Sequence, residues 1–517
     1  MTIETEHSRY TTATFSGHTF RQLIYQRSLN ALPGTLVWVV FVLSVLGSRY
    51  RPRWMLTIAA LLVLYLAVRF CAAGLANIIG LRRIRSWERI DWQAHYTQFV
   101  DVGALAWDDI HHIVIIPNYN EPLSILKQSL DALAAYRDAH ERLTIVLAME
   151  ADEVGSIQKA QELIAAYHRA FAGIFYTTHP DHLPGEIRGK SANLAWAFTE
   201  VKQWLLNEVR YNLDCVIVTV MDSDTLWHEH YFDALTYHFA IHHDRYHCLW
   251  QAPIRYHGNI WSLWPVLRPL HAYATAFELA YSAAPWWTAM PMSSYSLSYN
   301  LLNEINAWDT DVIADEWHVF IKAYFMTGGR AKVEPIMLPF RARVVTGATW
   351  WETAKNRYHQ SVRHAWGSKE IGYTIDRMLH TDDITWIDRY RLLVRVSHDL
   401  MLSSAGWGVL TIGSQLPLVL HSDLRSDIFR HRFDHPEFVL IQIAFAIITV
   451  LGILFWIVDI RERPPRSRPS LRDRMLEIIS LGLLPIMSFV FVALPMIYAQ
   501  TQMIFRHTIE FRVTTKE

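Results

Sequence analysis

Long apolar segments near both ends of the chain constrain its architecture most strongly. Two precede residue 100 and three follow residue 390, at residues 32–46, 54–79, 400–420, 438–457 and 475–499. About 20 apolar residues in a helix are enough to cross the hydrocarbon core of a bilayer. The sequence therefore predicts two membrane-spanning helices within residues 31–82 and about three within residues 396–500, with a polar part between them.

Arginine-rich loops predict how these helices are oriented. Residues 461–474 contain six arginines and two acidic residues, whereas the loop at residues 421–437 is balanced in charge. Because positively charged loops stay on the cytoplasmic side, this difference places the polar middle part in the cytoplasm. Arg49, Arg51 and Arg53 would then lie outside and depart from the rule.

The middle part alternates between short apolar runs and amphipathic stretches. Apolar runs occupy residues 112–116, 143–149, 174–177, 215–221 and 248–252, and amphipathic stretches occupy residues 123–136, 156–171 and 192–208. This alternation predicts an α/β domain over residues 100–352, with a mainly parallel, Rossmann-like sheet. Around it we expect a polar segment at residues 1–30 with an amphipathic helix near 20–29, interfacial amphipathic helices at residues 353–395, and a tail at residues 501–517.

Composition excludes two classes of protein. The 517 residues include 48 Lys and Arg against 49 Asp and Glu, which gives no electrostatic signal for nucleic-acid binding. The three cysteines, Cys71, Cys215 and Cys248, form no Cys-x-x-Cys pair. A disulfide-stabilised secreted domain is therefore excluded, and a reducing compartment is the simpler expectation for the α/β domain.

Two carboxylates follow the apolar run at residues 215–221. Asp222 and Asp224 are one residue apart, so strand alternation predicts that they point to the same side, at the sheet edge where ligands bind in α/β folds. Hard oxygen ligands there suit Mg²⁺ or Mn²⁺ and, with the metal, a diphosphate. The alternative is that one of the two acids caps a helix.

Other polar groups follow the neighbouring predicted strands. Pro117, Asn118, Tyr119 and Glu121 follow the first strand, and Glu150 and Asp152 follow the second. These groups can present hydrogen-bonding atoms to a nucleotide, or they can simply begin the next helix. The stretch from Gly185 to Asn193 lacks P-loop glycine spacing, but its Lys190 or Arg188 can meet a phosphate.

Two further constellations lie nearer the last apolar segments. Asp315 and Glu316 precede a helical stretch, where a carboxylate can either accept a proton from a hydroxyl group or cap the helix. Gln360, Arg363 and Trp366 are spaced three residues apart and share one helical face, which suits a sugar or diphosphate or a helix that lies on the membrane.

The order of these motifs is more specific than any one of them. Six motifs follow one another over roughly residues 105–370, between the apolar segments. In chain order they are Asn-Tyr-Asn-Glu, an acidic strand end, Gly-Lys-x-x-Asn, Asp-x-Asp, paired acids and Gln-x-x-Arg. The chain thus resembles the membrane-integrated glycosyltransferases of family 2, the group that includes cellulose, hyaluronan and chitin synthases. The resemblance implies a GT-A fold and an inverting transfer of a sugar.

The resemblance also implies roles for individual residues. Asp222 and Asp224 would hold the diphosphate of the nucleotide-sugar through Mg²⁺ or Mn²⁺. The rest of the nucleotide-sugar would be bound by Pro117, Asn118, Tyr119, Glu121, Glu150, Asp152, Lys190 and Asn193. Glu316 would be the general base, beside Asp315, although the family pattern has the acids in the opposite order. Gln360 and Arg363 would contact the acceptor or diphosphate. His364 stands where the family has Trp, so either His364 or Trp366 would take the role of that ring.

These expectations combine into one functional prediction. The chain would transfer a sugar from a nucleotide-sugar, most simply a UDP-sugar, to a growing polysaccharide at the cytoplasmic face of a bacterial or archaeal plasma membrane, with export through the spans. Its partners would be the donor, a carbohydrate or lipid acceptor, and membrane lipids, without nucleic acid. The alternatives are a non-processive transferase with a lipid acceptor and a catalytically silent membrane subunit that binds nucleotide.

Overall fold

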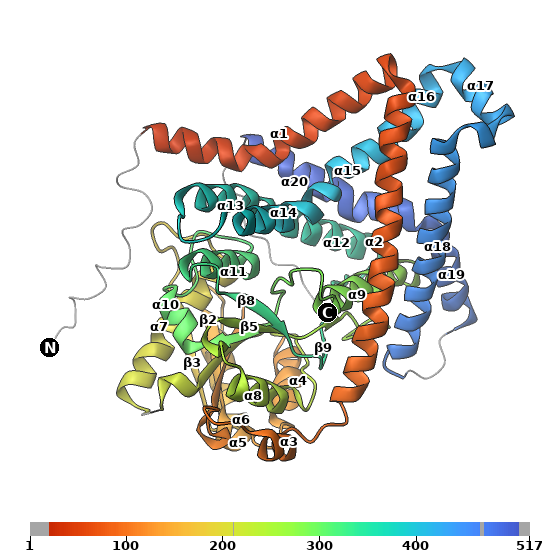
Figure 1. The fold of residues 1–517 in the computed structure, drawn as a ribbon. Helices are drawn as coiled ribbons and strands as arrows, with labels where there is room; N and C mark the ends of the chain where they lie inside the picture. Colours follow the sequence, from red (N-terminus) through yellow and green to blue (C-terminus); the bar gives the residue numbers. More distant parts are fainter. Residues whose placement is uncertain (1–19, 210, 466–469, 506–517) are drawn as a thin grey trace.

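The computed structural model describes residues 20–209, 211–465 and 470–505. These residues form an α/β domain and a set of long helices that extends from it (Figure 1). The predicted polar segment before residue 20, and the predicted tail beyond residue 505, lie outside the described residues.

The α/β domain is organised on a seven-stranded sheet with the order β3-β2-β1-β4-β7-β5-β8. Its strands are β1 (His111–Pro117), β2 (Leu143–Glu150), β3 (Gly173–His179), β4 (Val216–Val220), β5 (Cys248–Gln251), β7 (Tyr295–Ser298) and β8 (Lys332–Pro335). Neighbouring strands run parallel except that β7 is antiparallel to both β4 and β5. A separate parallel pair joins β6 (Ile254–Arg255) to β9 (Phe340–Arg341). The prediction of a mainly parallel sheet is confirmed.

Alternate residues of the central strands face opposite layers of helices. On β1, Val114 and Ile116 pack with α4 (Leu123–Ala134), α6 (Ser156–Tyr167) and α8 (Tyr231–Ile241). Ile113 and Ile115 pack with α7 (Lys190–Asn207) and α11 (Asp315–Met326). Burial of such large apolar side chains on both faces is what fixes the register of the strands.

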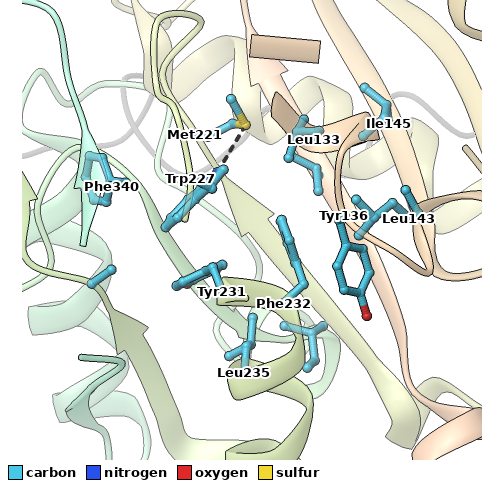
Figure 2. Packing of buried hydrophobic residues seen from close by; sticks show 14 of the residues in the cluster. Leu133, Tyr136, Leu143, Ile145, Met221, Trp227, Tyr231, Phe232, Leu235 and Phe340 are labelled. Atoms are coloured by element: carbon cyan, nitrogen blue, oxygen red, sulfur yellow. Dashed lines mark hydrogen bonds between the residues drawn. The ribbon is translucent and has the colours of Figure 1, made fainter. Parts of the chain in front are cut away.

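The first of these layers is rich in aromatic rings (Figure 2). The indole N–H of Trp227 donates to the sulfur of Met221 at 3.4 Å, and the Trp227 ring stacks on Tyr231 with centroids 3.9 Å apart. Met221 directly precedes Asp222. This packing therefore anchors the end of β4, the strand that carries the predicted metal ligands.

Within the described residues, four helical segments are long and apolar enough to cross a membrane: Ile24–Tyr50, Pro52–Trp87, Pro436–Glu462 and Leu471–Phe505. They belong to α1 (Phe20–Tyr50), α2 (Pro52–Trp87), α18 (Pro436–Glu462), and α19 (Leu471–Ser488) with its continuation through Phe489–Ala493 into α20 (Leu494–Phe505). The amphipathic helix expected near residues 20–29 is not separate, because α1 continues through it into the first apolar segment.

The first of the three apolar segments predicted after residue 390 forms a shorter helix than expected. The helix α14 (Trp386–Leu402) breaks near Ser404, and the apolar helix that follows covers only Ala405–Leu420. That helix comprises α15 (Ala405–Gly408), a π-helical turn and α16 (Ser414–Leu420). Where about three spans were predicted, the described residues after 390 thus contain two helices long enough to cross a membrane and one shorter apolar helix.

The remaining helices are α3 (Trp92–Phe99), α5 (Ala139–Arg142), α9 (Arg268–Ala283), α10 (Tyr299–Glu304), α12 (Trp350–Ala365), α13 (Lys369–His380) and α17 (Ser422–Arg430). Of these, α12 and α13 lie with α14 between the sheet and the long helices (Figure 1). They occupy the region in which amphipathic interfacial helices were predicted.

The two loops that predicted the orientation lie at opposite ends of the long helices. Asp427, in the balanced loop, lies 3.9 Å from Arg53 at the start of α2. At the other end, buried Asp459 bonds His257 of the α/β domain at 2.8 Å, and the indole N–H of Trp261 donates to the carbonyl of Pro464 at 3.0 Å. The arginine-rich loop therefore adjoins the α/β domain, and its cytoplasmic location stays a prediction.

Candidate functional site

Polar loops gather at the carboxyl ends of β1, β2 and β4. The strand order places β2 and β4 on either side of β1, so the chain reverses its direction of winding there. Ligands of open α/β sheets bind at such a switch point. The residues predicted for a site follow these strands, and the structure shows which of them meet.

Lys190 is the centre of this site. At the first turn of α7, its Nζ donates to Asp222 Oδ1 at 2.9 Å, to Glu316 Oε1 at 3.2 Å and to the Ser293 carbonyl at 2.7 Å. Asp315 Oδ2 is 3.8 Å away. Although burial opposes its charge, neighbouring carboxylates, of which Asp222 contributes most, raise the pKa of Lys190 well above its usual value. One ammonium thus joins two of the predicted acidic motifs.

Ser293 completes the contacts of Asp222. Its hydroxyl donates to Asp222 Oδ2 at 2.9 Å. Its φ of 54° lies in the left-handed region, which a serine adopts only when its surroundings impose it. This direct contact between Ser293 and Asp222 could not be read from the sequence.

Asp315 and Glu316 differ in accessibility, although they are adjacent. The Asp315 side chain is 3% exposed and that of Glu316 is 24% exposed. Burial and the neighbouring Glu316 charge raise the pKa of Asp315 to about 8, although Lys190 acts in the opposite direction. Burial therefore favours the neutral form of Asp315, and Glu316 is the carboxylate that a ligand can reach.

The two acids of Asp-x-Asp have different partners. The Asp222 side chain is 31% exposed and faces Lys190, whereas Asp224 is 2% exposed and its Oδ2 accepts a hydrogen bond from the backbone N–H of Arg343 at 3.3 Å. The strand β4 ends at Val220, before both acids, so strand alternation no longer sets their directions. Asp222 is therefore the more accessible candidate ligand.

A metal ion fits Asp222 only if substrate supplies further ligands. In the described part of the chain, no three His, Cys, Asp or Glu side chains gather as a protein-only metal site requires. Mg²⁺ is commonly held by one or two carboxylates together with substrate phosphates. The accessible oxygen atoms of Asp222 fit this second kind of site.

The loop after β1 is held by a residue that the sequence analysis did not select. Glu153 Oε2 accepts hydrogen bonds from the backbone N–H of Asn120 at 2.9 Å and from Asn118 Nδ2 at 3.1 Å. Lys159 pairs with the other oxygen of Glu153. Asn120 has a positive φ of 57°, so Glu153 stabilises a loop conformation that would otherwise be unfavourable.

Replacing Glu153 with Gln is expected to weaken binding of any ligand at this loop about tenfold. The substitution removes the charge from two charge-assisted hydrogen bonds and leaves Lys159 without its carboxylate partner. Calorimetric titration of the nucleotide that the wild type binds provides the measurement. Glu162→Gln is the matched control, because Glu162 also pairs with a lysine but lies exposed on α6. Equal affinities for Glu153→Gln and wild type would contradict a positioning role.

The acids after β2 have side-chain partners of their own. The hydroxyl of Tyr119 donates to Asp152 Oδ2 at 3.4 Å, and Arg188 pairs with the same oxygen while its guanidinium lies 4.6 Å from the centre of the Tyr119 ring. Glu150 bonds His179 at 2.9 Å. Tyr119, Asp152 and Arg188 thus form one surface unit, whereas Glu150 is buried.

His179 links Glu150 to a second carboxylate. Its Nε2 lies 2.9 Å from Glu186. Burial opposes protonation, but the hydrogen bonds to Glu150 and Glu186 raise the pKa of His179 to about 9. His179 is therefore charged at neutral pH and compensates the two acids.

Several predicted residues play structural parts in this arrangement. Asn193 is buried and its Nδ2 donates to the carbonyl of Ala148 at 2.9 Å, an oxygen that also accepts from the Asn118 backbone at 2.9 Å. Pro117 closes β1, and the Glu121 carbonyl accepts from Lys159 at 3.1 Å. Asn193 and Asn118 therefore hold α7 and the first loop against β2.

The Gln-x-x-Arg motif lies on α12, as predicted. Gln360 Oε1 accepts from Arg357 at 2.9 Å, Arg363 is half-buried and His364 is exposed. Trp366 follows the helix and is only 1% exposed, packed with Val362, Ala499 and Met503. The suggestion that Trp366 offers a stacking surface for a ligand is wrong in this structure, because the ring is part of the core between α12 and α20.

A buried ion cluster fixes the helix that carries Asp315 and Glu316. His318 bonds Asp309 at 2.9 Å through Nε2 and Glu370 at 3.0 Å through Nδ1. Both partners are acceptors, so both ring nitrogens donate and the ring is charged. Although burial opposes this charge, Glu370 and Asp309 raise the pKa of His318 to about 10.

We expect His318→Gln to lower the melting temperature by on the order of 10 °C near neutral pH, because it breaks a buried charge cluster. The folded-state pKa of His318 lies above its ordinary value, so this stabilisation is complete below about pH 6.5 and disappears as the pH rises through about 10. Thermal unfolding in detergent across this range measures the difference. A difference from wild type that stays constant at high pH would contradict the charged state of His318.

Comparisons with known proteins find distant structural matches. No protein-family model matches the chain, and no curated protein matches its sequence. A mannosyltransferase from Pyrobaculum calidifontis, PcManGT, solved with GDP-Man and Mn²⁺, is 15% identical with a TM-score of 0.40, over 74% of this chain and 98% of its own. Residues 1–349 of TarS from S. aureus are 12% identical with a TM-score of 0.32, over 65% of this chain and 91% of theirs. With scores of this size, the functional assignment depends on the residues described above.

Proposed function

We propose that this protein is a membrane-bound glycosyltransferase that moves a sugar from a nucleotide-sugar to an acceptor. The observation that carries the proposal is the meeting of Asp222 and Glu316 at Lys190, at a switch point of the sheet. Such a site has an accessible carboxylate for a metal–diphosphate, a cation for phosphate oxygens and a second accessible carboxylate for proton removal. The order of motifs in the sequence supports the same reading.

The proposed mechanism assigns one task to each group. The loop of Asn118 and Tyr119, held by Glu153, would bind the nucleoside. A bound Mg²⁺ or Mn²⁺ would offset the charge that grows on the departing diphosphate. Lys190 would give up part of its contact with Glu316 and meet the diphosphate. Glu316 would then accept the proton from the attacking hydroxyl of the acceptor, giving an inverting displacement.

We propose a polysaccharide as the product, with the four long helices beside the α/β domain contributing an exit path. A lipid acceptor is the second candidate, because the helix Ala405–Leu420 is short and leaves fewer full-length spans than the sequence predicted. Extraction of the reaction product with organic solvent distinguishes a polysaccharide from a glycosylated lipid. A product that stays entirely in the organic phase and carries one sugar contradicts polymer synthesis.

Ligand-dependent thermal stabilisation tests the proposed donor. A panel of UDP-, GDP- and other nucleotide-sugars with Mn²⁺ or Mg²⁺ should raise the melting temperature selectively, because a ligand that binds only the folded state stabilises it by mass action. EDTA should remove most of this shift, and added Mn²⁺ should restore it. If no nucleotide-sugar shifts the transition while the protein remains folded, the proposal fails. Binding without any turnover would instead favour the silent subunit.

A further inference from the structure

A cavity lies apart from the site around Lys190. It has a volume of about 850 Å³ and lies between the end of α2, the loop after α9, α11, the edge strand β8 and α14. Its wall includes the polar or aromatic side chains of Arg83, Trp286, Tyr324, Lys332 and Arg391. None of the residues proposed to bind the donor lines it.

The surroundings of the cavity are apolar on two sides. The helix α14 exposes Trp386, Ile387, Tyr390 and Val394, which recur at helical spacing and lie beside Arg391. A helix with an exposed apolar face and a basic residue at its border lies in the interface of a membrane. On the other side, α2 exposes Leu75 and Ile78, one to two turns before Arg83. Acyl chains can therefore lie on both surfaces next to the cavity.

The charges of the cavity leave one cation available. Arg391 lies 3.0 Å from Asp388, and Lys332 lies 3.6 Å from Glu334. Arg83 makes no hydrogen bond or ion pair with any residue that the structure describes. It follows directly on the apolar part of α2, and basic residues are frequent at the ends of membrane spans. The cavity thus has a net positive charge where a headgroup would lie.

We propose that this cavity binds the headgroup of a phosphate-bearing anionic lipid, whose acyl chains lie along α2 and α14. Arg83 meets the phosphate, and Arg391 and Lys332 exchange part of their contacts with Asp388 and Glu334 for it. Trp286 and Tyr324 supply the amphipathic rings that are frequent at membrane interfaces. A lipid is favoured over a soluble ligand because the apolar surfaces of α2 and α14 lead to the cavity from outside the α/β domain.

Removing the charge of Arg83, and separately that of its neighbour Arg82, tests the proposal. The full-length protein in mild detergent is titrated with phosphatidylglycerol, and bound lipid is counted by native mass spectrometry, with phosphatidylcholine as the neutral comparison. Loss of one such charge near a membrane surface is worth about fivefold in affinity, so Arg83→Gln should weaken phosphatidylglycerol binding by about that factor. The control Arg82→Gln removes the same charge from the preceding residue, which does not line the cavity.

Each other outcome overturns the proposal. Equal loss in Arg82→Gln and Arg83→Gln shows only a diffuse attraction to basic residues. Equal retention of phosphatidylcholine and phosphatidylglycerol shows that the cavity does not distinguish lipids by the net charge of the headgroup. Competition by millimolar inorganic phosphate in wild type but not in Arg83→Gln assigns the cavity to a soluble anion. Arg391→Gln repeats the test on a second exposed residue and should also weaken binding of phosphatidylglycerol.

Discussion

Replacing Glu316 with Gln should lower kcat for sugar transfer by about 10²–10⁴-fold, the usual contribution of a general base. Glu316 is the accessible member of the acidic pair and lies 3.2 Å from Lys190, on the first turn of α11. Gln preserves the size of the side chain and the hydrogen bond to Lys190, but it cannot accept a proton from a hydroxyl group. Steady-state kinetics with saturating donor measures the effect, and KM for the donor should change little.

Asp315→Asn is the matched control for this prediction. Because the raised pKa of about 8 favours the neutral form of Asp315 at neutral pH, the amide should replace it with less than about a tenfold loss. Above about pH 8, wild-type Asp315 ionises beside Glu316 and Asp222 and should weaken binding of the diphosphate, whereas the variant should not show this decline. If Asp315→Asn is inactive and Glu316→Gln is active, the two roles are reversed and the assignment of the base is wrong.

Asp222→Asn should reduce kcat/KM by on the order of 10²–10³-fold, because it removes the accessible ligand for the metal–diphosphate and a partner of Lys190. The same variant should require more Mn²⁺ or Mg²⁺ for half-maximal activity. Titration of the metal at fixed donor concentration separates this effect from a general loss of activity.

A control for Asp222 lies at the other end of the same strand. Asp214 is exposed before β4 and accepts a hydrogen bond from Asn300 at 2.8 Å. Asp214→Asn removes one carboxylate without touching the site and should keep wild-type kinetics. If Asp222→Asn keeps kcat/KM within about threefold of wild type, Asp222 holds neither metal nor diphosphate.

Local pattern was enough to predict much of the fold. Strands β1, β2 and β4 are runs of Ile, Val and Leu buried on both faces, so they stand out from the polar loops around them. The strand β7 was missed, because it reads Tyr-Ser-Leu-Ser and has no apolar run. Its serine hydroxyls are satisfied by distant groups: that of Ser296, for example, bonds the hydroxyl of Thr219 on β4 at 2.7 Å. Such a pairing depends on tertiary contact and leaves no local signal.

Some residues of the candidate site could likewise be predicted from the sequence, and others could not. Asp222, Lys190 and Glu316 could be selected from the sequence because charged residues at strand ends and helix starts are recognisable there. The contacts of Glu153 and Ser293 could not be predicted, because they are made to the backbone of Asn120 and to the side chain of Asp222. Trp366, in contrast, was predicted as a ligand contact but is not one. Helical spacing placed it on the face of Gln360, whereas α20 covers its ring.

The central claim is that Asp222, Lys190 and Glu316 form one sugar-transfer site. Its most direct test is an assay of the protein reconstituted in lipid nanodiscs with radiolabelled nucleotide-sugars and Mn²⁺, in which released nucleoside diphosphate and acceptor-linked sugar are both counted. We expect equal amounts of the two products for wild type with at least one donor, and neither above background for Glu316→Gln. Equal turnover by the wild type and Glu316→Gln, or none by the folded wild type with any donor in the panel, would contradict it.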